Sequence, residues 1–175
     1  MKRKHDFYRV TRFRNKRKTI AIMNGDELSK IKPNGYDAII DKRQGEYIFN
    51  TSDDKLHFPQ RIPKIGVARW LLFLTLLREP GKPWTAFEIG SFSERYVPKD
   101  INSDMYKAMR RTVDSLYISE NLRCGLYLWR KALRENKNKP HFFLSQKPLA
   151  IAWNPTRSFL LIEPIIEGLE DIRYG

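Results

Sequence analysis

The stretch from Leu122 to Leu133 reads LRCGLYLWRKAL and decides the fold expected for this chain. At about 100° per residue, four apolar side chains fall within about 40° of one another on a helical wheel: Leu122, Leu126, Trp129 and Leu133. Smaller or flanking apolar residues extend this arc on one side, namely Gly125, Leu128 and Ala132. The pattern predicts a helix over about 119–135, capped by Ser119, with its apolar face in a core.

The adjoining face of this predicted helix is basic. About 80–140° from Leu122 lie three arginines and a tyrosine, with a lysine just beyond them: Arg123, Tyr127, Arg130, Arg134 and Lys131. The major groove of a DNA duplex admits one α-helix, and arginine there pairs with guanine or binds phosphate. A solvated basic face is the simpler interpretation of an isolated helix, but the charge of the whole chain favours nucleic acid.

That charge is +13 over 175 residues, with a pI of about 9.9. Such an excess opposes compaction and calls for an acidic partner such as nucleic acid or an anionic surface. Hydrophobic residues at 41% are sufficient for a real core. The single cysteine, Cys124, excludes an intrachain disulfide and favours a reducing compartment. The chain shows neither an apolar stretch of membrane-spanning length nor the apolar segment of a signal peptide, so we expect it in the cytoplasm without membrane attachment.

The N-terminal segment is strongly basic. Residues 2–18 hold nine Lys or Arg against one acid, Asp6. Phe7–Phe13 and Lys18–Met23 predict two strands joined across 14–17, the alternative being a disordered basic arm. We expect the cations at the start, Lys2, Arg3 and Lys4, to contact phosphate.

Further elements follow from turn signals and apolar spacing. Asn34-Gly35 marks a turn before a predicted hairpin of Tyr36–Asp41 and Glu46–Asn50. A short strand over Lys55–Phe58 and an extended link between two prolines come next. Large apolar residues at helical spacing then predict a central helix that ends at Glu79-Pro80-Gly81; they are Val67, Trp70, Leu71, Leu74 and Leu77.

The second half of the chain predicts two further helices before the basic one. Thr85 and Glu88 form a capping-box pattern that starts a short helix to about Phe92. Met105, Met109, Val113 and Leu116 share a face of the next helix, which also carries two candidate phosphate contacts, Arg110 and Arg111. After the basic helix, Phe142–Leu144 and Leu149–Trp153 predict a hairpin with Lys147 in its turn, and 158–162 a last strand. We expect Leu126, Trp129 and Leu133 to pack on the central helix.

The stretch from Leu122 to Leu133 resembles the recognition helix of OmpR/PhoB-type winged-helix domains. That family has an aliphatic residue, a second one four positions later, then a Leu-Arg pair and a final Leu. In this chain Trp129 stands where the family has the Leu of the Leu-Arg pair. The segment 58–81 is similar to the family's leading strand, first helix and Pro-Gly, and 142–153 takes the place of its wing. The chain departs from the family in a longer connection over 93–117 and in residues beyond 155. No receiver domain precedes the fold, so phosphorylation control is not expected.

The resemblance implies an α+β fold: a winged helix-turn-helix with a leading antiparallel sheet, three or four helices and a C-terminal hairpin wing. The expected domains are a basic arm or first strand over 1–18, a winged-helix domain over 19–165 and an acidic tail over 166–175. The implied function is sequence-specific binding of double-stranded DNA in transcription regulation, without catalysis or cofactor. The expected DNA contacts are Arg123, Tyr127, Arg130, Lys131, Arg134 and, in the wing, Lys147.

Other functions stay open. The same scaffold suits a protein–protein interaction module, or an RNA-binding or replication-initiation protein, and RNA polymerase, another regulator or a second copy of the chain are candidate further partners. Acidic residues of the first predicted hairpin suggest a metal-dependent nuclease only weakly, because such residues more often lie on a solvated surface; they are Asp37, Asp41 and Glu46. The three histidines are too far apart in sequence to predict a zinc site.

Overall fold

The computed structural model describes residues 7–32, 35–41, 46–49, 60–63, 66–132, 141–146 and 149–165. The fold is α+β and separates into two compact units, one of residues 1–65 with 156–175 and one of residues 66–155. The single domain expected over 19–165 stays a prediction. The last strand joins the N-terminal sheet. The helices and the hairpin that lie between this sheet's segments in the sequence therefore form a second unit.

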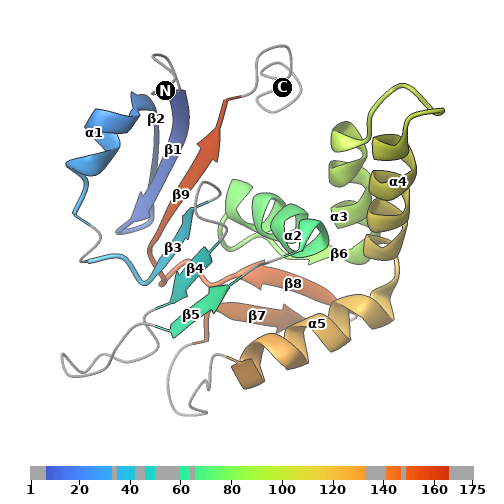
Figure 1. Ribbon diagram of the computed structural model, residues 1–175. Helices are drawn as coiled ribbons and strands as arrows, with labels where there is room; N and C mark the ends of the chain where they lie inside the picture. The colour runs from blue at the N-terminus through green and yellow to red at the C-terminus, as the bar shows by residue number, and fades with distance from the viewer. Residues whose placement is uncertain are drawn as a thin grey trace. The chain divides into compact units, whose positions relative to one another are not determined.

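The first unit is built on a six-stranded sheet of order β2-β1-β9-β3-β4-β5 (Figure 1). Its strands are β1 (Phe7–Arg14), β2 (Arg17–Asn24), β3 (Ala38–Asp41), β4 (Glu46–Phe49), β5 (Gln60–Pro63) and β9 (Phe159–Pro164). Strand β9 pairs antiparallel with β1 and parallel with β3. The leading sheet was expected to be antiparallel; it is mixed instead, because a distant strand is inserted between the two N-terminal hairpins.

The hairpin of β1 and β2 replaces the disordered-arm alternative for residues 7–24. Its two-residue turn consists of Asn15 and Lys16, whose φ angles are 53° and 60°. Two successive positive φ angles are typical of a type I′ turn, which matches the right-handed twist of the strands. The predicted hairpin of β3 and β4 is also confirmed. The candidate phosphate contacts Lys2, Arg3 and Lys4, and the strand expected over 55–58, lie outside the described residues.

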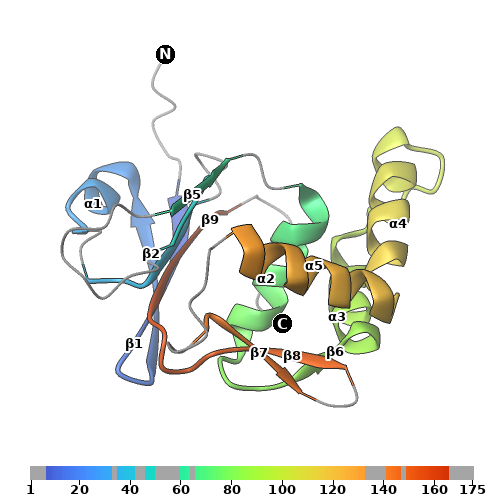
Figure 2. The same ribbon diagram turned by 90° about the horizontal axis from the view of Figure 1, so that it is seen from below.

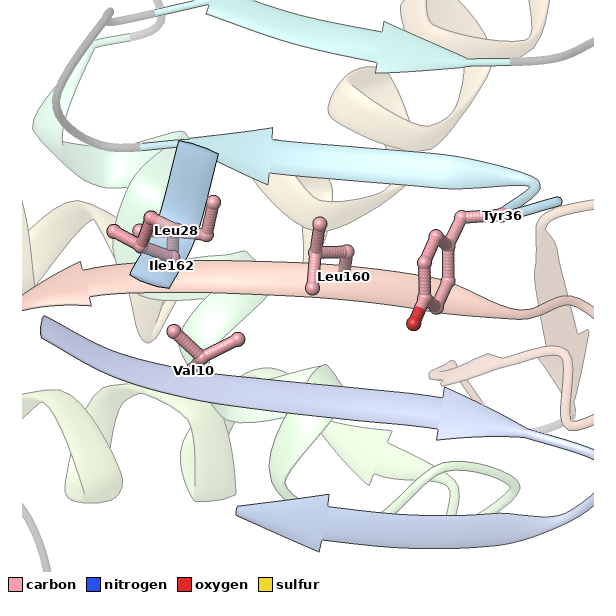
Figure 3. Packing of buried hydrophobic residues seen from close by; sticks show 5 residues of the cluster. All are labelled: Val10, Leu28, Tyr36, Leu160 and Ile162. Atoms are coloured by element: carbon pink, nitrogen blue, oxygen red, sulfur yellow. The ribbon is translucent and has the colours of Figure 1, made fainter. Parts of the chain in front are cut away.

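A short helix that the sequence analysis missed, α1 (Gly25–Ser29), covers one face of this sheet. Asn24 caps it, because its side-chain oxygen accepts a hydrogen bond from the Glu27 backbone N–H at 2.9 Å. Figure 3 shows Leu28 of α1 over the sheet beside Ile162, with Val10, Leu160 and Tyr36 completing the buried cluster. The cluster joins β1, α1 and β9 into one hydrophobic core.

The second unit contains four helices, a 3₁₀ turn and a three-stranded sheet of order β6-β8-β7 in its described residues. In chain order they are α2 (Val67–Arg78), β6 (Trp84–Thr85), α3 (Ala86–Ser93), the 3₁₀ turn η1 (Glu94–Tyr96), α4 (Asp104–Leu116), α5 (Ser119–Ala132), β7 (Phe143–Gln146) and β8 (Ala150–Trp153). Helices α3 and α4 lie side by side, and α5 runs beside the β7–β8 hairpin (Figures 1 and 2).

The sequence predicts most of these elements correctly. Helix α2 is buried nearly all round, as its apolar pattern predicts, and the hydroxyl of Thr75 donates to the Leu71 carbonyl at 2.8 Å. The capping box of α3 is confirmed, since Thr85 and Glu88 exchange two hydrogen bonds of 3.2 Å. The hairpin β7–β8 is also confirmed, and its Phe143 ring packs 5.8 Å from that of Phe73 in α2.

Two glycines inside helices provide a matched test of this packing. A Cβ added at Gly90 in α3 would lie 2.6 Å from the Tyr117 ring, whereas one added at Gly125 in α5 meets nothing within 4 Å. We expect Gly90→Ala to destabilise by about 1–2 kcal/mol through overpacking. We expect Gly125→Ala to stabilise by about 0.5–1 kcal/mol through helix propensity. Urea unfolding of both variants checks the signs, and a stabilising Gly90→Ala would contradict the close approach of Tyr117.

Candidate nucleic-acid interface

Helix α5 starts directly after α4, with a sharp change of direction between them. The helix α4 ends at Leu116, and the backbone N–H groups of Asn121 and Leu122 then donate to the Ile118 carbonyl at 3.0 and 3.3 Å. The side-chain amide of Asn121 donates to the Ser115 carbonyl at 3.0 Å and fixes the connection. Ser119 is the first residue of α5 rather than its expected cap.

The two predicted faces of α5 are present, with one correction. Leu122 is buried, with 8% of its surface exposed, and Leu126 is half-buried, so the apolar face points into the unit. The Arg123 side chain is 61% exposed and Tyr127 is 67% exposed, so these two residues of the basic face are open to solvent. Leu128, expected on the apolar arc, is 51% exposed. It lies too far round the helix to reach the core.

The apolar face of α5 packs against the central helix and the hairpin. Leu126 lines a small void of about 10 Å³ together with Leu72 of α2 and two hairpin residues, Phe143 and Ile151. The central-helix residues that were expected to receive α5, namely Trp70, Leu71 and Leu74, are buried. The expected partners Leu133 and the Trp129 side chain lie outside the described part of the chain. Leu72 is not one of those three residues, so the packing of α5 on Trp70, Leu71 and Leu74 stays a prediction.

A groove of about 400 Å³ separates the basic face of α5 from the hairpin. Arg123 and Tyr127 line its helix side, and Ser145 and Gln146 line its hairpin side. Its floor is apolar, formed by Leu122, Leu126, Leu149, Ala150 and Ile151. Figures 1 and 2 show α5 running along the hairpin that forms the opposite wall. The groove thus combines polar rims with a hydrophobic base.

Leu149, which lines this groove at the hairpin turn, has an unusual backbone. Its φ is 140°, a region that side chains other than glycine rarely adopt, and it is 41% exposed. Such a conformation costs on the order of 1–3 kcal/mol and is most often kept at binding sites. Its N–H donates to the Gln146 carbonyl at 3.1 Å, which holds the turn.

One of the two candidate phosphate contacts of α4 is engaged within the protein. The Arg110 guanidinium donates to both carboxylate oxygens of Glu94 at 2.6 Å and, through Nε, to Asp114 at 2.8 Å. These hydrogen bonds lower the pKa of Glu94 and raise that of Arg110. The Tyr117 hydroxyl also donates to Glu94 at 2.9 Å. Arg110 therefore joins α4 to η1 in this structure, whereas Arg111 beside it is exposed.

The other expected DNA contacts have no side-chain description. Arg130 and Lys131 belong to α5 by their backbone, but their side chains lie outside the described residues, as do Arg134 and Lys147 entirely. The structure therefore brings together two of the six expected contacts, Arg123 and Tyr127, which lie four residues apart on one exposed face.

Metal-binding and membrane-spanning features are not seen in the described part of the chain. It contains no group of three His, Cys, Asp or Glu placed to hold a metal ion. The hairpin acids weighed for a nuclease include Asp37, whose carboxylate binds Ser158 and Arg157, and Asp41, which is 7% exposed. No helix over the described ranges has the length and apolarity needed to cross a membrane.

Comparisons of the chain with protein-family models, characterised proteins and solved structures give no match. We therefore infer the function from the chain's own residues.

Proposed function

We propose that this protein binds double-stranded DNA sequence-specifically and regulates transcription, with α5 as the helix that enters the major groove. The observation that carries the proposal is the exposed face of α5, where Arg123 and Tyr127 project beside an apolar face that is buried at Leu122 and half-buried at Leu126. A helix held in this way presents its polar residues rigidly, which base recognition requires.

The order of elements supports a winged-helix arrangement of the OmpR/PhoB type. The central helix α2 is followed by the short strand β6, which pairs with β8 of the hairpin after α5. In this arrangement β7–β8 is the wing, and its turn at Lys147 reaches the phosphate backbone. The added helix α4 corresponds to the longer connection over 93–117.

The charge of Arg123 is available for a ligand. Among the described residues it pairs with Glu120, at a distance of 3.6 Å between side chains that are both more than half exposed. Such a surface pair contributes little to stability, so a nucleic acid displaces it at small cost. Tyr127 adds a hydroxyl and a ring that reach bases or sugar. The net charge of +13 supplies the non-specific attraction that accompanies such contacts.

Alanine variants of α5 test the proposal. After selection of bound duplexes from a random pool, we expect Arg123→Ala to weaken binding of the selected duplex by about 1–3 kcal/mol and to relax its sequence preference. Lys99→Ala removes one exposed cation outside the proposed interface and serves as the control. It should weaken selected and random duplexes alike and only slightly. Folded Arg123→Ala and Tyr127→Ala variants with the affinity and preference of the parent would exclude α5 as the reading helix.

The apolar floor of the groove favours a second function, a protein–protein interaction module. Leucines and an isoleucine at the base of a groove suit an apolar peptide better than a phosphate backbone. The selection experiment separates the two functions. A chain that enriches no duplex sequence and shows no salt-dependent binding favours the interaction module.

A further inference from the structure

A basic hollow that the sequence analysis did not anticipate lies in the first unit, beside α1. It has a volume of about 410 Å³ and is lined by Arg12, Arg14, Glu27, Lys30, Ile31, Lys32 and Tyr36. Four of these seven residues are cations and one is an acid. They come from β1, from α1 and from the segment that leads to β3. The chain thus gathers positive charge from two segments that are about twenty residues apart.

The four cations of the hollow outnumber its single acid, Glu27. Within the described ranges, Arg12, Arg14, Lys30 and Lys32 form no ion pair with a carboxylate. Four cations beside one acid leave a net positive charge around one depression, which opposes folding through mutual repulsion. A bound anion removes that repulsion.

Arg14 is held in place before any ligand arrives. Its Nη2 donates to the Gly35 carbonyl at 3.0 Å, and its guanidinium lies 4.5 Å from the centre of the Tyr36 ring. Tyr36 is itself buried, and Figure 3 shows it lying across β9 with its hydroxyl toward β1. Gly35 has a φ of +103°, and a Cβ there would lie 2.8 Å from Arg14 Nη2. The turn is therefore shaped to let the guanidinium approach.

Arg12 is placed next to it by the strand. Residues 10, 12 and 14 of β1 share one face of the sheet, because side chains alternate along a strand. Val10 on this face packs under Leu28 of α1, so the two arginines emerge where the cover of α1 ends. Arg12 Nη2 also contacts the Met23 sulfur at 3.9 Å. Two guanidinium groups thus line one wall of the hollow.

We propose that this hollow is a binding site for a phosphate group. Two planar guanidinium groups suit the paired oxygens of a phosphate, and two flexible ammonium groups add the charge needed to balance a dianion. A single carboxylate ligand leaves most of this charge unbalanced. The phosphate belongs either to a free phosphorylated small molecule or to a nucleic-acid backbone. The site lies in a different unit from α5, so it does not depend on the function proposed above.

Titration with inorganic pyrophosphate at constant ionic strength tests the site. We expect saturable binding, with amide NMR shifts concentrated at residues 12–14 and 27–36. Arg14→Gln and Lys32→Gln should each weaken binding by about tenfold or more, the effect of losing a charge-assisted hydrogen bond. Lys32 is exposed, so its variant keeps the test valid even if Arg14→Gln impairs folding. Lys99→Gln removes an equal charge elsewhere and should bind as the parent does.

Two results would overturn the proposal: binding of the parent that does not saturate, or an equal loss in Lys99→Gln. A competing DNA duplex then identifies the source of the phosphate. If the duplex displaces pyrophosphate, and Arg14→Gln makes the slope of log affinity against log salt shallower by about 0.9, the ligand is the DNA backbone. If pyrophosphate binds saturably and the duplex does not compete, the ligand is a free phosphorylated molecule.

Discussion

Replacing Trp153 with alanine is expected to lower the free energy of unfolding by about 3–5 kcal/mol. Trp153 has no exposed surface, and its ring lies 5.6 Å from that of Phe143 and 5.8 Å from that of Phe142. Its carbonyl also accepts a hydrogen bond from the Gly81 N–H at 2.9 Å, which ties β8 to the turn that follows α2. The truncation leaves a cavity that the surrounding aromatic rings fill only in part.

Thermal and urea unfolding followed by far-UV circular dichroism measure this loss. Leu128→Ala is the control, because Leu128 is 51% exposed and should change stability by no more than about 0.5 kcal/mol. A small loss for Trp153→Ala would contradict its central position. A large loss of stability in Leu128→Ala would show instead that Leu128 packs on the apolar face of α5, as the helical wheel predicts.

Elements with strong local signals are predictable from this sequence. Helix α2 follows from dense apolar spacing, and α3 from the capping box of Thr85 and Glu88, because both signals lie within a few residues of the structure they specify. The hairpin β7–β8 follows for the same reason. Helix α1 was missed although Asn24 and Glu27 carried a cap signal, because five residues are too few to show apolar periodicity.

Features that depend on distant residues could not be predicted in this way. The strand β9 was expected, but its parallel pairing with β3 joins residues about 120 positions apart and leaves no local trace. Arg110 looks like a free cation in sequence, and its engagement by Glu94 appears only when α4 folds beside η1. The basic hollow is similar, since Arg14 and Lys32 meet only once α1 has folded over β1. For α5, the sequence predicts the exposure of Arg123 and Tyr127 because both positions follow from helix geometry alone.

The link between β3 and β9 leads to the second large effect: Asp37→Ala should lower the stability of the first unit by about 3 kcal/mol. The Asp37 carboxylate accepts hydrogen bonds from the N–H of Ser158 at 2.8 Å and from its hydroxyl at 3.2 Å. It also lies 3.6 Å from the guanidinium of Arg157, whose side chain is only 9% exposed. Breaking a buried pair costs about 3–5 kcal/mol. The lower end applies because a third of the Asp37 side chain reaches solvent.

The measurement must report on the first unit, since all four tryptophans lie within residues 70–153, in the other one. Amide hydrogen exchange of β3 and β9 meets this need. Asp37→Asn is the matched control: it keeps an oxygen that accepts from Ser158 but loses the charge opposite Arg157, so its loss should be intermediate. If the two variants lose equal stability, the whole effect comes from the charge of Asp37 opposite Arg157. Unchanged exchange in Asp37→Ala would show that β9 is held in the sheet by its strand pairing alone, without the side-chain contact that joins residues 37 and 158.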